Sequence, residues 1–156
     1  MKIALASDQG GFRLKQEVIA LVREMKVEFE DFGNHSEEPV NYVEYGMKAC
    51  ESFLAGNCDR VILFCGTGLG MAIVANKFKG IRATPCWSVD TATVSRKHNN
   101  ANCLTLGGRV FPPETVKAIV RAWLTTEFEG GRHSLRVGTI LALEDKNFKP
   151  VERSRR

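Results

Sequence analysis

The sequence predicts an α/β fold in which a parallel β-sheet carries helices on both faces. Short apolar runs alternate with longer segments of helical periodicity along the 156 residues, which is the pattern of strands joined by crossover helices. The strongest strand signal, Asp59–Cys65, contains an unbroken apolar run from Val61 to Phe64, as expected for a buried strand. No internal repeat or long linker interrupts the chain. We therefore expect one domain over residues 1–147, followed by a basic tail over residues 148–156.

The predicted strands share short apolar runs that end at glycine, proline or polar residues. In chain order they are Lys2–Ser7, Val27–Phe32, Asp59–Cys65, Ile81–Pro85 and Asn102–Leu106. The predicted helices share apolar residues at helical spacing. In chain order they cover residues 12–25, a segment after Pro39, residues 69–77, residues 90–98, a segment opened by Pro112-Pro113, and residues 134–146.

Three of these helices have an apolar face that we expect to point inward. The first helix carries Leu14, Val18, Leu21, Val22 and Met25. The helix after Pro39 carries Met47, Cys50, Phe53 and Leu54, and the helix after Pro113 carries Val116, Ile119, Val120, Trp123 and Leu124. Trp87 and Trp123 are interpreted as core or interface residues.

The composition excludes several classes of protein. No apolar run approaches the ~18 residues of a membrane span, and the apolar start of the chain breaks early, so we expect neither a membrane span nor a signal peptide. The five cysteines include no CxxC pair, which fits neither a disulfide scaffold nor a zinc ribbon, and free thiols indicate the cytoplasm. The net charge of +4 comes partly from Arg153, Arg155 and Arg156, which we interpret as a solvated tail. No basic stretch is interleaved with aromatic residues, which disfavours nucleic-acid binding.

The best candidate for chemistry is the segment Cys65-Gly66-Thr67-Gly68-Leu69-Gly70, which lies directly after the strongest strand and before a helix. Ligands of a parallel sheet bind beyond the carboxyl ends of its strands, so this loop and those after Ser7 and Leu106 are the ones to consider. The alternating glycines allow a tight turn in which several backbone N–H groups point at one anion, and such surroundings favour a thiolate. Cys65 is therefore a candidate nucleophile or base. The alternative is an inert, buried cysteine in a tight turn.

Three known phosphate-binding motifs do not fit this segment. Its glycine spacing is GxGxG rather than GxGxxG, and no Gly-Lys-Ser/Thr follows. A cysteine phosphatase loop needs an arginine where this chain has Met71. A nucleotide-binding domain is therefore a poor interpretation.

Polar residues elsewhere add to the candidate site. Asp8 ends the first strand and should lie on the same edge as Cys65, or it caps the following helix. His98 ends a helix, where it either acts chemically or complements the helix dipole. Arg109, Arg132 and Arg136 lie near candidate loops and could clamp one phosphate, although each alone is interpretable as a surface arginine. No His/Asp/Glu spacing supports a metal site.

Four segments of the chain resemble the ribose-5-phosphate isomerase B family, which includes the subunits of galactose-6-phosphate isomerase. They are KIALASDQGGFRLK, CGTGLGMAIVANKFKGIRA, SRKHNNANCLTLGGRV and AWLTTEFEGGRHSLRV, and the resemblance extends from Met1 to about Asp145. It implies a Rossmann-like three-layer α/β/α sandwich with a five-stranded parallel sheet. It also implies an aldose–ketose isomerisation of a sugar phosphate through a cis-enediolate, without a metal or other cofactor.

The resemblance assigns roles to individual residues. Cys65 matches the base that moves a proton between the first and second sugar carbons, and Thr67 matches the residue that handles the hydroxyl proton. His98 matches the residue that assists ring opening, and Asp8 matches a polar partner of the sugar hydroxyls. The implied substrate contacts are the backbone N–H groups of Gly66, Gly68 and Gly70, the side chains of Gln9, Tyr42 and Asn99, and the phosphate-binding Arg109, Arg132 and Arg136. Such sites form between two subunits, which implies a homodimer or a dimer of dimers.

The chain departs from the family pattern at substrate contacts. Gln9 stands where the family usually has histidine. The triplet Asn41-Tyr42-Val43 stands where it usually has Asp-Tyr-Pro. We therefore expect the reaction type to be retained, with a tetrose, pentose or hexose phosphate as the candidate substrate. A non-catalytic sugar-phosphate-binding or partner subunit is the alternative, and the intact Cys65, Thr67 and His98 argue against it.

Overall fold

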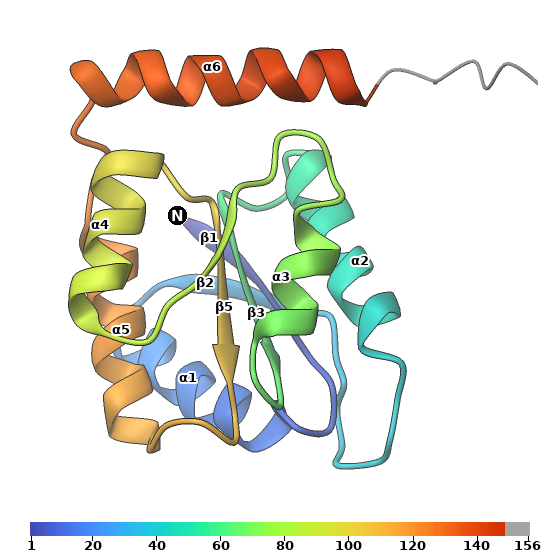
Figure 1. Cartoon of the computed structure of the whole chain (residues 1–156). Coiled ribbons are helices and arrows are strands. Elements are labelled where there is room, and N and C mark those ends of the chain that lie inside the picture. Colours follow the sequence, from blue (N-terminus) through green and yellow to red (C-terminus); the bar gives the residue numbers. More distant parts are fainter. Residues whose placement is uncertain (149–156) are drawn as a thin grey trace, which may run out of the picture.

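Five strands of the computed structural model, which describes residues 1–148, form one parallel sheet in the order β2-β1-β3-β5-β4 (Figure 1). The strands are β1 (Lys2–Ser7), β2 (Glu28–Asp31), β3 (Arg60–Cys65), β4 (Ala83–Pro85) and β5 (Cys103–Gly107). β3 lies at the centre of the sheet, and all of its residues are buried. Its register aligns Phe64 with Ser7 of β1 and with Leu106 of β5, so the ends of these three strands meet at one edge.

The helices are α1 (Phe12–Glu24), α2 (Tyr42–Leu54), α3 (Leu69–Ala75), α4 (Val89–Asn99), α5 (Pro113–Thr125) and α6 (Arg132–Asn147). Helices α1 to α5 cover the two faces of the sheet, and α6 lies at one of its edges (Figure 1). Ile62 and Phe64 point toward the layer built by α1 and α5, where Val18 and Trp123 are fully buried. Val61 and Leu63 point toward α2 and α3. The predicted α/β sandwich with a five-stranded parallel sheet is therefore confirmed.

Each predicted strand and helix is found within a few residues of its expected limits. The apolar stripe of α5 is buried throughout, including Trp123. The predicted inward face of α2 is partly wrong, because Met47 and Leu54 are exposed. Cys50 is buried as predicted, and α2 turns Gly46 and Ala49 inward in place of Met47 and Leu54. A Cβ at Gly46 would lie 3.1 Å from the sulfur of Met71, so small residues on this face let α2 pack closely against α3.

α6 lies at the opposite edge of the sheet from the Cys65 loop (Figure 1). Gly80, which precedes β4, donates its backbone N–H to the Glu144 carboxylate of α6 at 3.1 Å. Within α6 only His133 and Val137 are buried. No helix among residues 1–148 is long and apolar enough to cross a membrane. The predicted tail residues Arg153, Arg155 and Arg156 lie outside the described residues.

Candidate active site

Cys65 is the last residue of β3, and its side chain is 6% exposed. The backbone N–H of Gly68 donates a hydrogen bond to Cys65 Sγ over 3.1 Å. Gly68 has a φ of +83°, and a Cβ there would lie 3.0 Å from the backbone of Leu106. Only glycine accepts both the left-handed backbone and the close neighbour, so the loop turns back on the sulfur because of this residue. An N–H donor on sulfur stabilises a thiolate.

Asp8 lies beside the Cys65 loop. The backbone N–H of Asp8 donates to the carbonyl of Phe64, and its buried side chain accepts from the Gly11 N–H at 3.0 Å. A Cβ built on Gly10 would lie 3.0 Å from Gly66 N and 3.3 Å from Asp8 Oδ1, so the loops after β1 and β3 touch. Gly11, not Asp8, is the N-cap of α1, so the interpretation of Asp8 as a helix cap is wrong; Asp8 instead binds the N–H of that cap residue and lies next to the Cys65 loop.

Three further predicted residues surround the same loop. The ring of Tyr42 lies about 3 Å from the position that a Cβ on Gly70 would take. The side chain of Arg109 lies within 4 Å of the position that a Cβ on Gly66 would take. Gln9 Oε1 accepts a hydrogen bond from the Val40 N–H at 3.0 Å, which ties this end of β1 to the loop before α2. We call the following group the Cys65 cluster: Asp8, Gln9, Tyr42, Cys65, Gly66, Thr67, Gly68, Gly70 and Arg109.

The remaining predicted residues form a second group. His98 lies in the last turn of α4, and its ring stacks on that of His133 in the first turn of α6. The ring centroids are 4.1 Å apart and the planes differ by 6°. Arg132 Nε donates to His133 Nε2 at 3.4 Å. We call His98, Asn99, Glu129, Arg132, His133 and Arg136 the His98 cluster.

The two clusters lie at opposite edges of the sheet within one chain. α4 begins after β4 at the carboxyl edge and runs back to the amino edge, where Arg82 Nε donates to the Asn99 carbonyl. The six residues of β3 separate the two edges by roughly 15–20 Å at the usual rise of a strand. One chain therefore brings Arg109 to Cys65 but leaves Arg132 and Arg136 at the far edge. A clamp of all three arginines on one phosphate requires a second copy of the chain.

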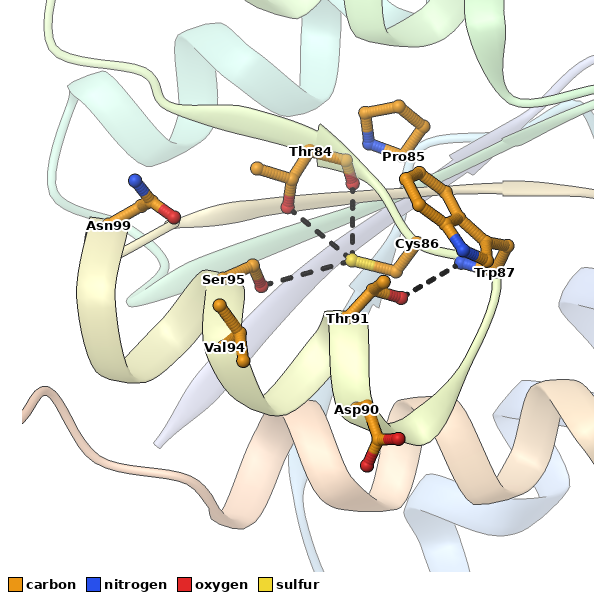
Figure 2. A pocket seen from close by; sticks show the side chains of 9 residues that line it. All are labelled: Thr84, Pro85, Cys86, Trp87, Asp90, Thr91, Val94, Ser95 and Asn99. Carbon is orange, nitrogen blue, oxygen red and sulfur yellow. Dashed lines mark hydrogen bonds between the residues drawn. The ribbon is translucent and has the colours of Figure 1, made fainter.

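Two apolar hollows beside the segment that joins β4 to α4 were not predicted. One, of about 300 Å³, lies between β4 and α4 (Figure 2). Figure 2 shows Cys86 Sγ between Thr84 and Ser95, its hydrogen-bond partners, with the indole of Trp87 at the rim. The other, of about 330 Å³, shares Trp87 and reaches Thr67 and Thr105. Trp87 is 62% exposed, so it is not a core residue, and no motif in the sequence predicts either hollow.

Comparison with known proteins assigns the chain to a family. The family described as Ribose/Galactose Isomerase matches residues 3–140. The chain belongs to the ribose/galactose isomerase family.

Individual members of the family align along nearly their whole length. Ribose-5-phosphate isomerase B of Escherichia coli is 45% identical over 145 residues, covering 93% of this chain and 97% of the relative. D-erythrulose-4-phosphate isomerase of Pectobacterium atrosepticum is 37% identical over 142 residues, covering 90% of this chain and 93% of the relative. The solved structure of Clostridium thermocellum ribose-5-phosphate isomerase B superposes with a TM-score of 0.91 at 47% identity, covering 94% of this chain and 99% of the other.

Three other cysteines of this ribose/galactose isomerase family member, Cys50, Cys86 and Cys103, lie in surroundings that keep a thiol protonated. All five cysteines are unpaired. Burial raises the pKa of Cys50 to about 12, and it raises the pKa of Cys86 and of Cys103. Thiols with a raised pKa stay protonated and make poor bases. Cys65, by contrast, accepts an N–H at the edge where the loops meet.

One group of side chains in residues 1–148 has the composition of a metal site. Ligand atoms of His98, Glu129 and His133 lie within 4.8 Å of one another. The two imidazole planes are nearly parallel, so their in-plane lone pairs do not converge on one ion. Burial, followed by the nearby His98, Arg132 and Arg136, lowers the pKa of His133, although Glu129 acts to raise it. The geometry and charge of this group therefore disfavour a cation.

Proposed function

We propose that the chain interconverts an aldose phosphate and a ketose phosphate through a cis-enediolate, with Cys65 as the base. Its family makes the chain an aldose–ketose sugar-phosphate isomerase, which is an intramolecular oxidoreductase. The observation that supports the proposed base is the 3.1 Å hydrogen bond from the Gly68 N–H to Cys65 Sγ, beside the carboxylate of Asp8.

The reaction needs a base and a group of hydrogen-bond donors. A proton next to a carbonyl is weakly acidic, and donors near the carbonyl oxygen stabilise the oxyanion that forms when it leaves. The Cys65 thiolate takes the proton from the second sugar carbon, and the electron pair moves to the carbonyl oxygen. Because the Gly68 N–H already donates to Cys65 Sγ, the N–H groups of Gly66 and Gly70 stabilise that charge in this proposal, and Thr67 passes the hydroxyl proton between the two oxygens. Return of the proton to the first carbon gives the ketose, so no oxidant or reductant is consumed.

The active site is completed by a second copy of the chain. In this arrangement His98 and Asn99 of one copy reach the Cys65 cluster of the other, where Arg132 and Arg136 join Arg109 on the phosphate. A two-fold interface makes two such sites at once. The support is the separation of the two clusters in one chain, together with apolar side chains that one chain leaves uncovered. These include Leu69 (58% exposed), Ile73 (64%), Trp87 (62%) and Leu135 (77%). The assembly is a homodimer or a dimer of dimers.

The substrate is a phosphorylated sugar of four to six carbons. Relatives are named for ribose 5-phosphate and for D-erythrulose 4-phosphate, so sequence similarity alone does not select the sugar. Gln9, Asn41 and Val43 replace residues usual in the family at substrate contacts, and we propose that they set the preference. The five unpaired thiols are consistent with work in the cytoplasm.

A turnover panel tests this function. Aldose and ketose phosphates of four, five and six carbons are incubated with the wild-type chain, with Cys65→Ala and with Cys58→Ala. Cys58 is a matched control because it has the same 6% exposure and precedes β3, whereas Cys65 ends that strand. We expect turnover of at least one sugar phosphate, loss of about 100-fold or more in Cys65→Ala, and wild-type rates in Cys58→Ala. Binding of a sugar phosphate without turnover in the wild type would instead identify a non-catalytic subunit, and full activity of Cys65→Ala would exclude Cys65 as the base.

A further inference from the structure

Backbone hydrogen bonds next to each ring hold the stacked pair of His98 and His133 in place. The Glu129 N–H donates to the Lys97 carbonyl at 3.1 Å, which joins the end of α4 to the segment before α6. The His133 N–H donates to the Gly130 carbonyl at 3.0 Å in the first turn of α6. His133 is 2% exposed and His98 is half-buried. The buried ring therefore offers a rigid face on which the more exposed ring rests.

The His133 ring is suited to act as a neutral stacking partner of His98 rather than as a second charged group. Its Nε2 accepts a hydrogen bond from Arg132, so the proton of the neutral ring lies on Nδ1. Nδ1 is buried and has no hydrogen-bond partner among residues 1–148. Burial, His98 and Arg132 each lower the pKa of His133. The ring has no hydrogen bond to substrate to offer, because both nitrogens are enclosed.

Stacking leaves the nitrogens of His98 available. In a face-to-face pair the ring nitrogens point outward in the plane of each ring, so neither nitrogen of His98 is directed at His133. The neighbouring Arg96 turns away, since its guanidinium donates to the carbonyls of Thr126 and Ala101. His133 thus fixes the plane of the His98 ring without occupying its hydrogen-bonding edges.

We propose that His133 is a positioning residue that holds the His98 imidazole in the orientation needed to open the ring of a cyclic sugar phosphate. This inference rests on the proposed function. In the step concerned, His98 takes the proton of the hydroxyl on the first carbon, the bond between that carbon and the ring oxygen breaks, and the ring oxygen receives a proton from His98. The aldehyde forms and the imidazole returns to its initial state. A misplaced acid–base group slows such a step by factors of about 10 to 100.

The step is separable from enediolate chemistry by the choice of substrate. Ribose 5-phosphate is cyclic and must be opened before isomerisation. Ribulose 5-phosphate is acyclic, because the hydroxyl needed to close a five-membered ring carries the phosphate. Exchange of a proton on its first carbon with deuterated water requires Cys65 but no ring opening. Conversion of ribose 5-phosphate therefore reports both steps, and deuterium exchange into ribulose 5-phosphate reports only the second.

Two variants at position 133 compare a flat ring with a branched side chain. His133→Phe keeps an aromatic face, His133→Leu removes it, and Thr139→Ala changes an exposed residue of the same helix as a control. We expect His133→Leu to lower kcat for ribose 5-phosphate by about 10- to 100-fold while deuterium exchange stays within about twofold of wild type. We expect His133→Phe to retain kcat within about threefold, and Thr139→Ala to match wild type.

The inference is wrong if conversion and exchange fall together, or if His133→Leu and His133→Phe behave alike. Should His133→Leu fail to fold, His133→Asn makes the same comparison, because it also lacks an aromatic face. Failure of the proposed function has a different signature, since the wild-type chain would then show neither conversion nor deuterium exchange.

Discussion

Gly68 donates its backbone N–H to Cys65 Sγ at 3.1 Å, from within the loop that the cysteine begins. The contact depends on a left-handed backbone at Gly68, whose φ is +83°. It links the conformation of one glycine to the chemistry of one thiol.

Gly68→Ala should lower both activity and stability. A side chain at this φ costs about 1–2 kcal/mol, and the new Cβ would meet the Leu106 backbone, so the N–H moves off the sulfur. We expect a loss in kcat of about tenfold or more. Gly56→Ala is the control, because Gly56 has a φ of +78° with open space around it. Urea unfolding should show destabilisation in both variants, whereas initial rates should show lost activity only in Gly68→Ala. Equal activities of the two variants would show that the contact between Gly68 and Cys65 does not matter for catalysis.

Mixing two inactive variants should restore activity. Cys65→Ala lacks the base and His98→Ala lacks the ring-opening group. If each active site takes Cys65 from one chain and His98 from the other, a mixed dimer contains one site in which both residues are intact. Random pairing makes half of the dimers mixed, with one of two sites intact, so about a quarter of wild-type activity should return. Initial rates before and after refolding the variants together measure this recovery. No recovery would contradict an active site that is shared between two copies of the chain.

Gln9→His should shift the substrate preference toward ribose 5-phosphate. The change removes the acceptor that holds the Val40 N–H and places an imidazole where the family usually has one. One hydrogen bond to substrate corresponds to about 1 kcal/mol, or roughly fivefold to tenfold in kcat/KM. The measured quantity is the ratio of kcat/KM for ribose 5-phosphate and erythrose 4-phosphate. An unchanged ratio would remove Gln9 from the explanation of specificity.

The wild-type fold should lose stability in mild acid because of His133. Its pKa lies below the ordinary value of 6.5, so between the two values the unfolded chain binds a proton that the folded chain does not. Stability from this group is complete above about pH 6.5 and falls as the pH falls toward the folded pKa. Urea unfolding of wild type and His133→Leu across this range should show a steeper acid dependence in wild type. Parallel curves for the two proteins would contradict the assignment.

The sequence predicts the Cys65 cluster better than the His98 cluster, for a physical reason. Cys65, Gly66 and Thr67 are consecutive, and Asp8 reaches them because parallel strands end at the same edge. His98 and Arg132 are placed by the return of α4 to the amino edge and by the path of α6, which no local spacing specifies.

Two other features depend on packing between distant segments. The exposure of Met47 follows from the close approach of α2 to α3 at Gly46. The stack of His98 on His133 joins α4 to α6, and the only local sign of it is that His133 and Val137 share one face of a helix. Contacts of this kind appear only when the elements are assembled in space.

The weak attachment of α6 to its own chain has a consequence for how its amide hydrogen exchange responds to dilution. Its contacts include the buried His133 and Val137, the Glu144 contact with Gly80 and an exposed ion pair from Lys79 to Asp145. A helix with so little burial opens locally at a small fraction of the free energy of global unfolding. If a second copy covers its apolar side chains, assembly supplies the missing protection by mass action. Amide hydrogens of α6 should then exchange with solvent faster as the protein is diluted, while those of β3 keep their rates.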